Sequence, residues 1–181
     1  MYDPYKHHRR SIRIKEYDYS QGGAYFVTIC VHDRECGFGE ILDWEMRLSP
    51  VGEIARQCWL EIPNHFSNIE LDEYVIMPNH VHGIIIIPPN TVGVQHVEPL
   101  QSKFQHIIPQ SMGSIVRQYK SAATRTCRQR GHEQFRWQRN YYEHIIRDQK
   151  DLNTTRRYIH DNQAKWYLDK ENPDNIQRIS A

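Results

Sequence analysis

Residues 74–87 of the 181-residue chain are YVIMPNHVHGIIII, and this stretch decides the fold that we expect. Two apolar runs rich in β-branched residues, 69–77 and 80–88, flank Pro78-Asn79, a dipeptide that favours a turn. The sequence therefore predicts an antiparallel hairpin. Because side chains alternate between the faces of a strand, His80 and His82 should point to the same side, about 7 Å apart along the backbone.

The elements around this hairpin complete one pattern. Residues 24–31 predict a strand, 38–48 a small hairpin, and Ser49-Pro50 opens a helix that ends at Pro63. Residues 112–130 predict an amphipathic helix, 135–146 an extended segment, and 148–168 a last helix. This order predicts an α+β, ferredoxin-like fold, a split βαββαβ antiparallel sheet with helices on one face, plus an appended C-terminal helix.

The length predicts a single domain over residues 1–181. Within it, 1–23 form a basic N-terminal arm, and 89–111 form a long flexible connection of the kind that is uncommon unless functional or disordered. The longest apolar run is far short of the ~20 residues that a membrane span needs, and the N-terminus lacks the apolar core of a secretory signal. We therefore expect a cytoplasmic protein with no membrane partner. Its four scattered cysteines suggest neither a zinc ribbon nor disulfides.

The formal net charge is only +1, but the charges are unevenly distributed. Residues 30–75 carry 3 basic and 10 acidic side chains, whereas residues 112–170 carry 13 basic and 6 acidic ones. A polyanion should therefore lie across the C-terminal half and the basic arm. The acidic first helix and the hairpin 38–48 should face away from it.

His80 and His82 are the first candidates for chemistry. Two imidazoles on one face of a strand can share a metal ion, although composition alone gives roughly 0.7 His-x-His triplets in a chain with 11 histidines. Their position in an otherwise apolar strand strengthens the case, since polar groups are costly to bury without partners. Gly83 beside them would allow close approach of another backbone or a ligand.

The last helix carries a second pair, Tyr158 and Asn162. Four residues apart, they share one helix face, where a hydroxyl and an amide oxygen can address the same point. The alternative is that Tyr158 is a core residue and Asn162 merely ends the helix. The chain has 11 tyrosines, and Tyr141 and Tyr142 also lie in the basic half.

Four blocks together resemble the HUH single-tyrosine transposases, and most closely the REP-associated tyrosine transposase (RAYT) group. They are YFVTIC at 25–30, VIMPNHVHG at 75–83, WQRNYYEHIIR at 137–147, and Tyr158 with Asn162. The resemblance runs in order from about Arg9 to Trp166. It departs from the family at Gln163, where many relatives have proline.

The resemblance implies that the chain is an enzyme that nicks single-stranded DNA next to hairpins and transfers strands. It implies that Tyr158 is the nucleophile that forms a 5′-phosphotyrosine, and that His80, His82 and Asn162 bind a divalent metal ion, Mg²⁺ or Mn²⁺. The protein would be a monomer or a homodimer, associated with the nucleoid when bound to DNA. We expect DNA contacts from the arm, the first basic helix and the segment before the last helix: Arg9, Arg10, Arg13, Arg117, Lys120, Arg125, Trp137, Arg139 and Arg147. For each of these, a solvated surface charge or a core aromatic is the alternative.

Two other functions remain open from the sequence. One is a non-catalytic protein that binds hairpin DNA or RNA on the same fold, although His80, His82, Tyr158 and Asn162 are all present. The other is a metal-dependent hydrolase unrelated to DNA, which would need a further carboxylate near the metal. Residues 76–87 contain no acidic side chain, but such a ligand can come from elsewhere in the chain.

Overall fold

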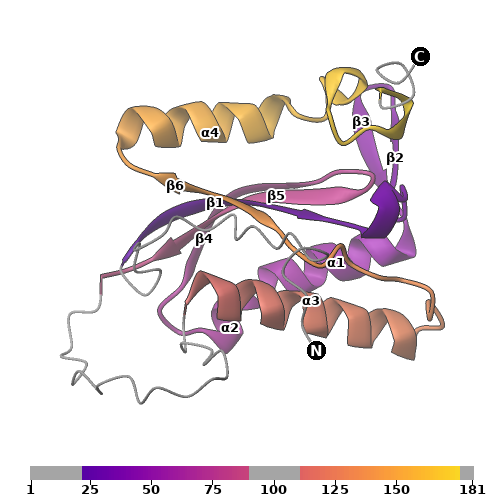
Figure 1. Cartoon of the computed structure of the whole chain (residues 1–181), viewed down its shortest axis with the longest axis horizontal. Helices are drawn as coiled ribbons and strands as arrows, with labels where there is room; N and C mark the ends of the chain where they lie inside the picture. The colour runs from indigo at the N-terminus through magenta and orange to yellow at the C-terminus, as the bar shows by residue number, and fades with distance from the viewer. Residues whose placement is uncertain (1–21, 90–110, 176–181) are drawn as a thin grey trace, which may run out of the picture.

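The computed structural model describes residues 22–89 and 111–175, so nearly all of the predicted arm and of the connection 89–111 lies outside the described residues. The strands and helices keep the predicted order (Figure 1). The strands are β1 (Gly23–Cys30), β2 (Gly39–Leu42), β3 (Glu45–Leu48), β4 (Glu70–Ile76), β5 (His80–Ile87) and β6 (Tyr142–Ile146). The helices are α1 (Pro50–Leu60), α2 (Ile62–His65), α3 (Met112–Gln129) and α4 (Gln149–Asp161), with short 3₁₀ turns η1 (His32–Arg34) and η2 (Trp166–Leu168).

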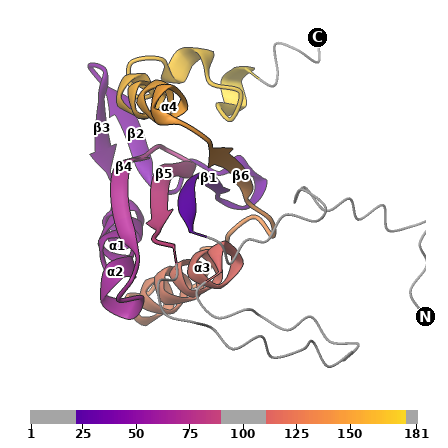
Figure 2. The ribbon, with the colours of Figure 1, turned by 90° about the vertical axis from the view of Figure 1, so that its left-hand side faces the viewer.

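Four strands form one antiparallel sheet in the order β4-β5-β1-β6, which confirms the ferredoxin-like α+β fold. Helices α1 and α3 cover one face, and the appended α4 lies across the opposite face (Figures 1 and 2). The predicted hairpin is β4-β5, and Pro78-Asn79 lies between its strands as expected.

Alternation along β5 sends its side chains into two different layers. Val81 and Ile85 belong to the main core under α1 and α3, whereas Ile84 belongs to a smaller core under α4. His80 and His82 share the α4 side with Ile84. Gly83 faces α1, and the indole ring of Trp59 fills the space beside it, so close approach at this glycine serves packing rather than a ligand.

Capping side chains start the long helices where the sequence predicts. Ser49 accepts a hydrogen bond from the backbone N–H of Gly52 and is followed by Pro50, and Ser111 caps α3 in the same way. Asp148 accepts from the N–H of Asp151 and starts α4. Each cap satisfies a donor that the helix itself leaves free.

Three predicted element boundaries are wrong. The helix that starts at Pro50 ends at Leu60, and Pro63 lies inside the separate short helix α2. In the segment 135–146 only β6 is a strand. The residues before it form a single isolated bridge, between Trp137 and Val31, the residue that follows β1. The last helix does not run to Leu168. It ends at Asp161, and the chain then turns back toward the sheet. Trp166, Asp169 and Glu171 pack around the start of β5. A straight helix would instead carry these three residues into solvent.

The hairpin β2-β3 lies beside the end of α4, contrary to the expectation that it faces away from the C-terminal half (Figure 1). The backbone N–H of Met46 donates to Oε1 of Gln163, and the rings of Trp44 and Tyr167 are in contact. The acidic helix α1 lies on the face of the sheet opposite α4, but there it packs beside the basic helix α3, so it does not face away from the whole basic half. In the described ranges, no helix combines the length and the apolarity that a membrane crossing requires.

Candidate active site

His80 and His82 converge under α4. Their Nε2 atoms are 3.0 Å apart, and both side chains are buried. Nδ1 of His80 lies 2.8 Å from Oδ1 of Asn79, and Nδ1 of His82 lies 2.9 Å from Oγ1 of Thr28. Because the amide oxygen of Asn79 can only accept, Nδ1 of His80 carries the proton and Nε2 presents a lone pair to the site.

Burial keeps both imidazoles neutral. Desolvation, with a smaller contribution from the Lys170 ammonium, lowers the pKa of His80 to about 3. The pKa of His82 is also well below its ordinary value, for the same reason and because His80 is close. Two neutral imidazole nitrogens that lie this close together can both bind one divalent cation.

Asp169 brings a carboxylate to this pair. Its Oδ2 lies 3.8 Å from Nε2 of His80, and ligand atoms of His80, His82 and Asp169 all fall within 4.8 Å of one another. Burial raises the pKa of Asp169 above its ordinary value. Sequence reasoning missed this residue, because nothing in the pattern of residues 162–175 indicates that the chain folds back over β5.

Tyr158 lies at the open side of the same cluster. Its hydroxyl is 3.3 Å from Nε2 of His82, its ring meets the edge of Phe26, and 45% of the residue is exposed. Desolvation raises the pKa of Tyr158 above its ordinary value, and a hydrogen bond with the Asn162 side chain acts in the opposite direction. The hydroxyl is therefore protonated at neutral pH and accessible from solvent.

Asn162 supplies the clearest sign that the site is built for a ligand. The residue is 4% exposed, yet its Oδ1 has no hydrogen-bond partner among the described residues. A buried acceptor without a partner costs about 1–3 kcal/mol. His80, His82 and Asp169 lie together, and the Asn162 side chain is linked to them through its hydrogen bond with Tyr158. Imidazole nitrogens with carboxylate and amide oxygens are a suitable donor set for Mg²⁺ or Mn²⁺, so these residues fit a divalent metal ion.

Two sets of contacts fix the parts of the site. Arg156 of α4 binds Asp72 of β4 through two nitrogens, with Nε 2.9 Å from Oδ1, which fastens α4 to the sheet edge. Nδ2 of Asn79 donates to the carbonyl oxygens of Glu171 (2.7 Å) and Arg34 (3.0 Å). The buried Glu171 carboxylate also pairs with Nε of Arg34 at 2.9 Å, so the segment that carries Asp169 is held over His80.

The predicted DNA-binding residues lie in other parts of the molecule. Arg9, Arg10 and Arg13 are outside the described residues. Arg117 and Arg125 are exposed on α3, across the sheet from Tyr158, and Arg139 and Arg147 are exposed before and after β6; these four are free to meet a polyanion.

Lys120 and Trp137 have internal partners instead. Lys120 donates to the carbonyl oxygens of Gln138 and Asn140, and burial lowers its pKa to about 8. The Trp137 ring packs against Phe38 and Phe135, and its Nε1 donates to the carbonyl oxygen of Lys120. Both side chains therefore stabilise the packing of α3 against the segment 137–140.

Comparisons with known proteins agree with this fold. No family model matches the chain. A protein of Haemophilus influenzae described as "Uncharacterized protein" is 44% identical over 168 residues, which cover 91% of this chain and 93% of that protein. A second protein of Haemophilus influenzae, described as "Putative REP-associated tyrosine transposase", is 29% identical over 149 residues, which cover 82% of this chain and 74% of that protein.

A solved structure of a REP-associated tyrosine transposase bound to a REP hairpin has the same fold. It superimposes with a TM-score of 0.56 at 23% identity and covers 84% of this chain and 74% of its own. The sequence likeness and the shared fold agree with the order of the motif residues His80, His82, Tyr158 and Asn162. In sequence and in fold the chain is therefore similar to the REP-associated tyrosine transposases.

Proposed function

We propose that the protein is a metal-dependent endonuclease and strand transferase that cuts single-stranded DNA next to a hairpin. The observation that carries the proposal is the accessible Tyr158 hydroxyl, 3.3 Å from Nε2 of His82 in a pair of neutral imidazoles. The side chain of Asn162 joins this arrangement through its hydrogen bond with Tyr158. The family includes a protein solved with a REP hairpin, which supports DNA hairpins as the substrate class. Such a substrate would place the protein at the nucleoid in the cytoplasm.

In this proposal His80, His82 and Asn162 hold Mg²⁺ or Mn²⁺, and Asp169 is a fourth candidate ligand. When bound, the cation would act as a Lewis acid on a non-bridging phosphate oxygen. Nitrogen ligands shift the intrinsic preference from Mg²⁺ toward Mn²⁺. Asn79 and Thr28 orient the imidazoles, so that both Nε2 atoms point to one place before any ligand arrives.

Tyr158 is the proposed nucleophile. Its oxygen forms a bond to phosphorus while the bond from phosphorus to the 3′ oxygen breaks, which leaves a 5′-phosphotyrosine and a free 3′-hydroxyl. The raised pKa of Tyr158 means that the phenolic proton must leave during the attack, and the departing 3′ oxygen takes up a proton, so that overall one proton passes from the phenol to the new 3′-hydroxyl. Because the ester bond is kept in the covalent intermediate, another 3′-hydroxyl can reverse the step and join strands without ATP.

The Tyr158 hydroxyl lies 3.3 Å from Nε2 of His82 in the same chain, which supports a site completed within a single subunit. A light-scattering mass of the purified protein tests this point. A mass of one chain, together with activity, is expected. Activity confined to a dimer would indicate that the two subunits exchange α4.

The decisive experiment mixes the protein with Mn²⁺ and a DNA hairpin that carries a labelled single-stranded flank, followed by a denaturing gel. The wild type should form a covalent adduct with the fragment that bears the new 5′ end. Tyr158→Phe should form none. Tyr142→Phe is the matched control, because Tyr142 is equally exposed on β6 and should not be needed.

Two outcomes would contradict the proposal. An adduct that persists in Tyr158→Phe would show that another tyrosine attacks, and Tyr141 and Tyr142 would be examined next. Hairpin binding by the wild type with no adduct in Mn²⁺ or Mg²⁺ would indicate a non-catalytic binding protein.

A further inference from the structure

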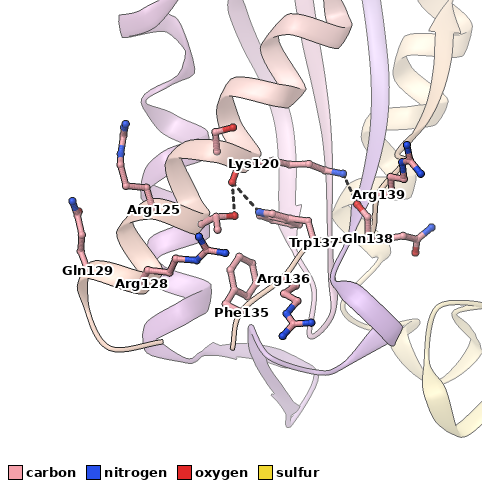
Figure 3. A pocket seen from close by; sticks show the side chains of 11 residues that line it. Lys120, Arg125, Arg128, Gln129, Phe135, Arg136, Trp137, Gln138 and Arg139 are labelled. Carbon is pink, nitrogen blue, oxygen red and sulfur yellow. Dashed lines mark hydrogen bonds between the residues drawn. The ribbon is translucent and has the colours of Figure 1, made fainter. Parts of the chain in front are cut away.

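A cationic groove lies on the α3 side of the sheet, away from Tyr158. It is a cavity of about 650 Å³ between α3 and the segment 135–139 (Figure 3). A second cavity of about 390 Å³ continues along α3 and shares Ser121 and Arg125 with it. The groove is lined by Lys120, Ser121, Thr124, Arg125, Arg128, Gln129, Phe135, Arg136, Trp137, Gln138 and Arg139, and none of these residues is acidic.

We call this cavity the arginine groove. Internal hydrogen bonds hold its two walls, α3 and the segment 135–139, in place. Lys120 of α3 reaches across to the carbonyl oxygens of Gln138 and Asn140, at 2.7 and 3.0 Å. The outer segment is tied to the end of β1, since Gln138 N–H donates to the carbonyl oxygen of Cys30. The groove is therefore formed before a ligand binds, and Lys120 is part of its frame.

Among the described residues, the four arginines of the groove have no acidic partner. Arg125 and Arg128 are exposed on α3, and Arg136 and Arg139 are exposed on the facing segment, on either side of Trp137 in Figure 3. Across residues 22–89 and 111–175, no carboxylate forms an ion pair with any of the four. Four permanent like charges around one cavity repel one another, so an anionic ligand would relieve the repulsion.

The groove suits phosphates better than bases. Proteins that grip single strands combine positive charge with free aromatic faces on which bases stack. Here Phe135 is buried, and the Trp137 ring is packed against Phe38, Tyr119 and Phe135. The exposed guanidinium groups can bind phosphate oxygens through two parallel hydrogen bonds, which fits a duplex whose bases face inward.

The register of the sheet relates the groove to the active site. Cys30 pairs with His80 on one side, and its carbonyl oxygen binds Gln138 on the other. Strands are spaced about 4.8 Å apart, so the backbones of His80 and Gln138 are about 10 Å apart. DNA held in the groove could therefore continue around the β6 edge of the sheet to Tyr158.

We propose that the arginine groove binds the phosphate backbone of the hairpin stem, while the single-stranded flank passes around the β6 edge to Tyr158. This inference rests on the proposed function for its substrate class and adds the location of the stem. The part of the DNA that is recognised as duplex and the part that is cut would then lie on opposite faces of the sheet.

The test compares two double variants of equal charge. Arg128→Gln with Arg136→Gln removes one guanidinium from each wall, whereas Arg47→Gln with Arg130→Gln removes two exposed arginines that do not line the groove. Binding to a synthetic DNA hairpin with a single-stranded flank, and to the flank alone, is measured by fluorescence anisotropy at several salt concentrations.

The groove variant should bind the hairpin substrate at least ~10-fold more weakly, and the slope of log Kd against log salt should fall by about 2, close to one for each lost phosphate contact. Its affinity for the flank alone should stay unchanged, and at saturating DNA it should still form the Tyr158 adduct. The control pair should match the wild type in every measurement.

Unchanged hairpin binding in the groove variant would overturn the inference. An equal loss for hairpin and flank would also overturn it, because the groove would then hold the single strand. Binding and adduct formation are measured separately, so the outcomes can be told apart. A wild type without adduct, whose groove variant still loses only hairpin binding, would refute the proposed chemistry and leave the stem site standing.

Discussion

Asn79 shows how much of the active site depends on one side chain. The sequence predicts it only as a turn residue beside Pro78, yet it is fully buried. Its Oδ1 accepts from Nδ1 of His80, and its Nδ2 donates to the carbonyl oxygens of Arg34 and Glu171. One amide thus sets the tautomer of a candidate ligand and anchors the segment that brings Asp169 into place.

At this scale we predict that the metal-free protein loses stability as the pH falls from 7 to 5. The pKa of His80 is about 3 in the folded protein and near 6.5 in the unfolded chain, so the unfolded chain binds the proton first. His80 alone should lower the free energy of unfolding by about 2 kcal/mol over this range, and His82 acts in the same direction.

Urea unfolding in EDTA at both pH values measures this change. His160→Gln, which removes an exposed histidine of α4, should keep the full pH dependence. Equal stability of the wild type at pH 7 and pH 5 would show that the two imidazoles are not held neutral by burial.

At the scale of the elements, β5 serves both layers of the fold. His80 and His82 face α4, whereas Gly83 faces α1 and receives the indole ring of Trp59. The strand is therefore packed on both of its faces. A rigid strand keeps both Nε2 atoms at one point, which is what a preorganised site requires.

Gly83→Ala should destabilise the protein by about 2 kcal/mol, the usual cost of overpacking. A Cβ at this position would lie 2.2 Å from Cζ2 of Trp59, so the indole ring or the strand must shift. Gly37→Ala is the control, because its nearest heavy atom would be 4.0 Å away. Chemical denaturation of both variants measures the difference, and equal stabilities would refute the packing argument.

At the scale of the whole molecule, the candidate active site joins segments from both ends of the described chain. Phe26 and Thr28 come from β1, the histidines from β5, Tyr158 and Asn162 from α4 and its end, and Asp169 from the turn beyond. The pairing of Arg34 with Glu171, 137 residues apart by their numbers, closes this assembly. Most of these contacts therefore exist only in the folded chain.

Arg34→Ala should weaken Mn²⁺ binding roughly tenfold, the effect typical of residues that orient metal ligands. Loss of the Arg34 side chain leaves the buried Glu171 carboxylate without its guanidinium partner and loosens the segment that carries Asp169. Isothermal titration with Mn²⁺ measures the change. Arg56→Ala, which breaks a surface pair with Glu53 on α1, should bind Mn²⁺ like the wild type.

An Arg34→Ala protein with unchanged Mn²⁺ affinity would show that the Arg34–Glu171 pair is not needed to hold the metal ligands in place. His80→Ala should lose far more affinity than Arg34→Ala in the same titration, because it removes a ligand directly. This comparison separates the central ligands from the segment that supports them.

The sequence by itself determined the sheet, the order of the elements and the pairs His80-His82 and Tyr158-Asn162, because strand alternation and helix periodicity depend on residues close together in the chain. Only the tertiary structure decided that α4 ends at Asp161, that Asp169 reaches His80, that Trp59 occupies the space at Gly83, and that β2-β3 lies beside α4. These features arise from contacts between segments far apart in sequence, and no local pattern of residues encodes which distant partner a side chain will meet.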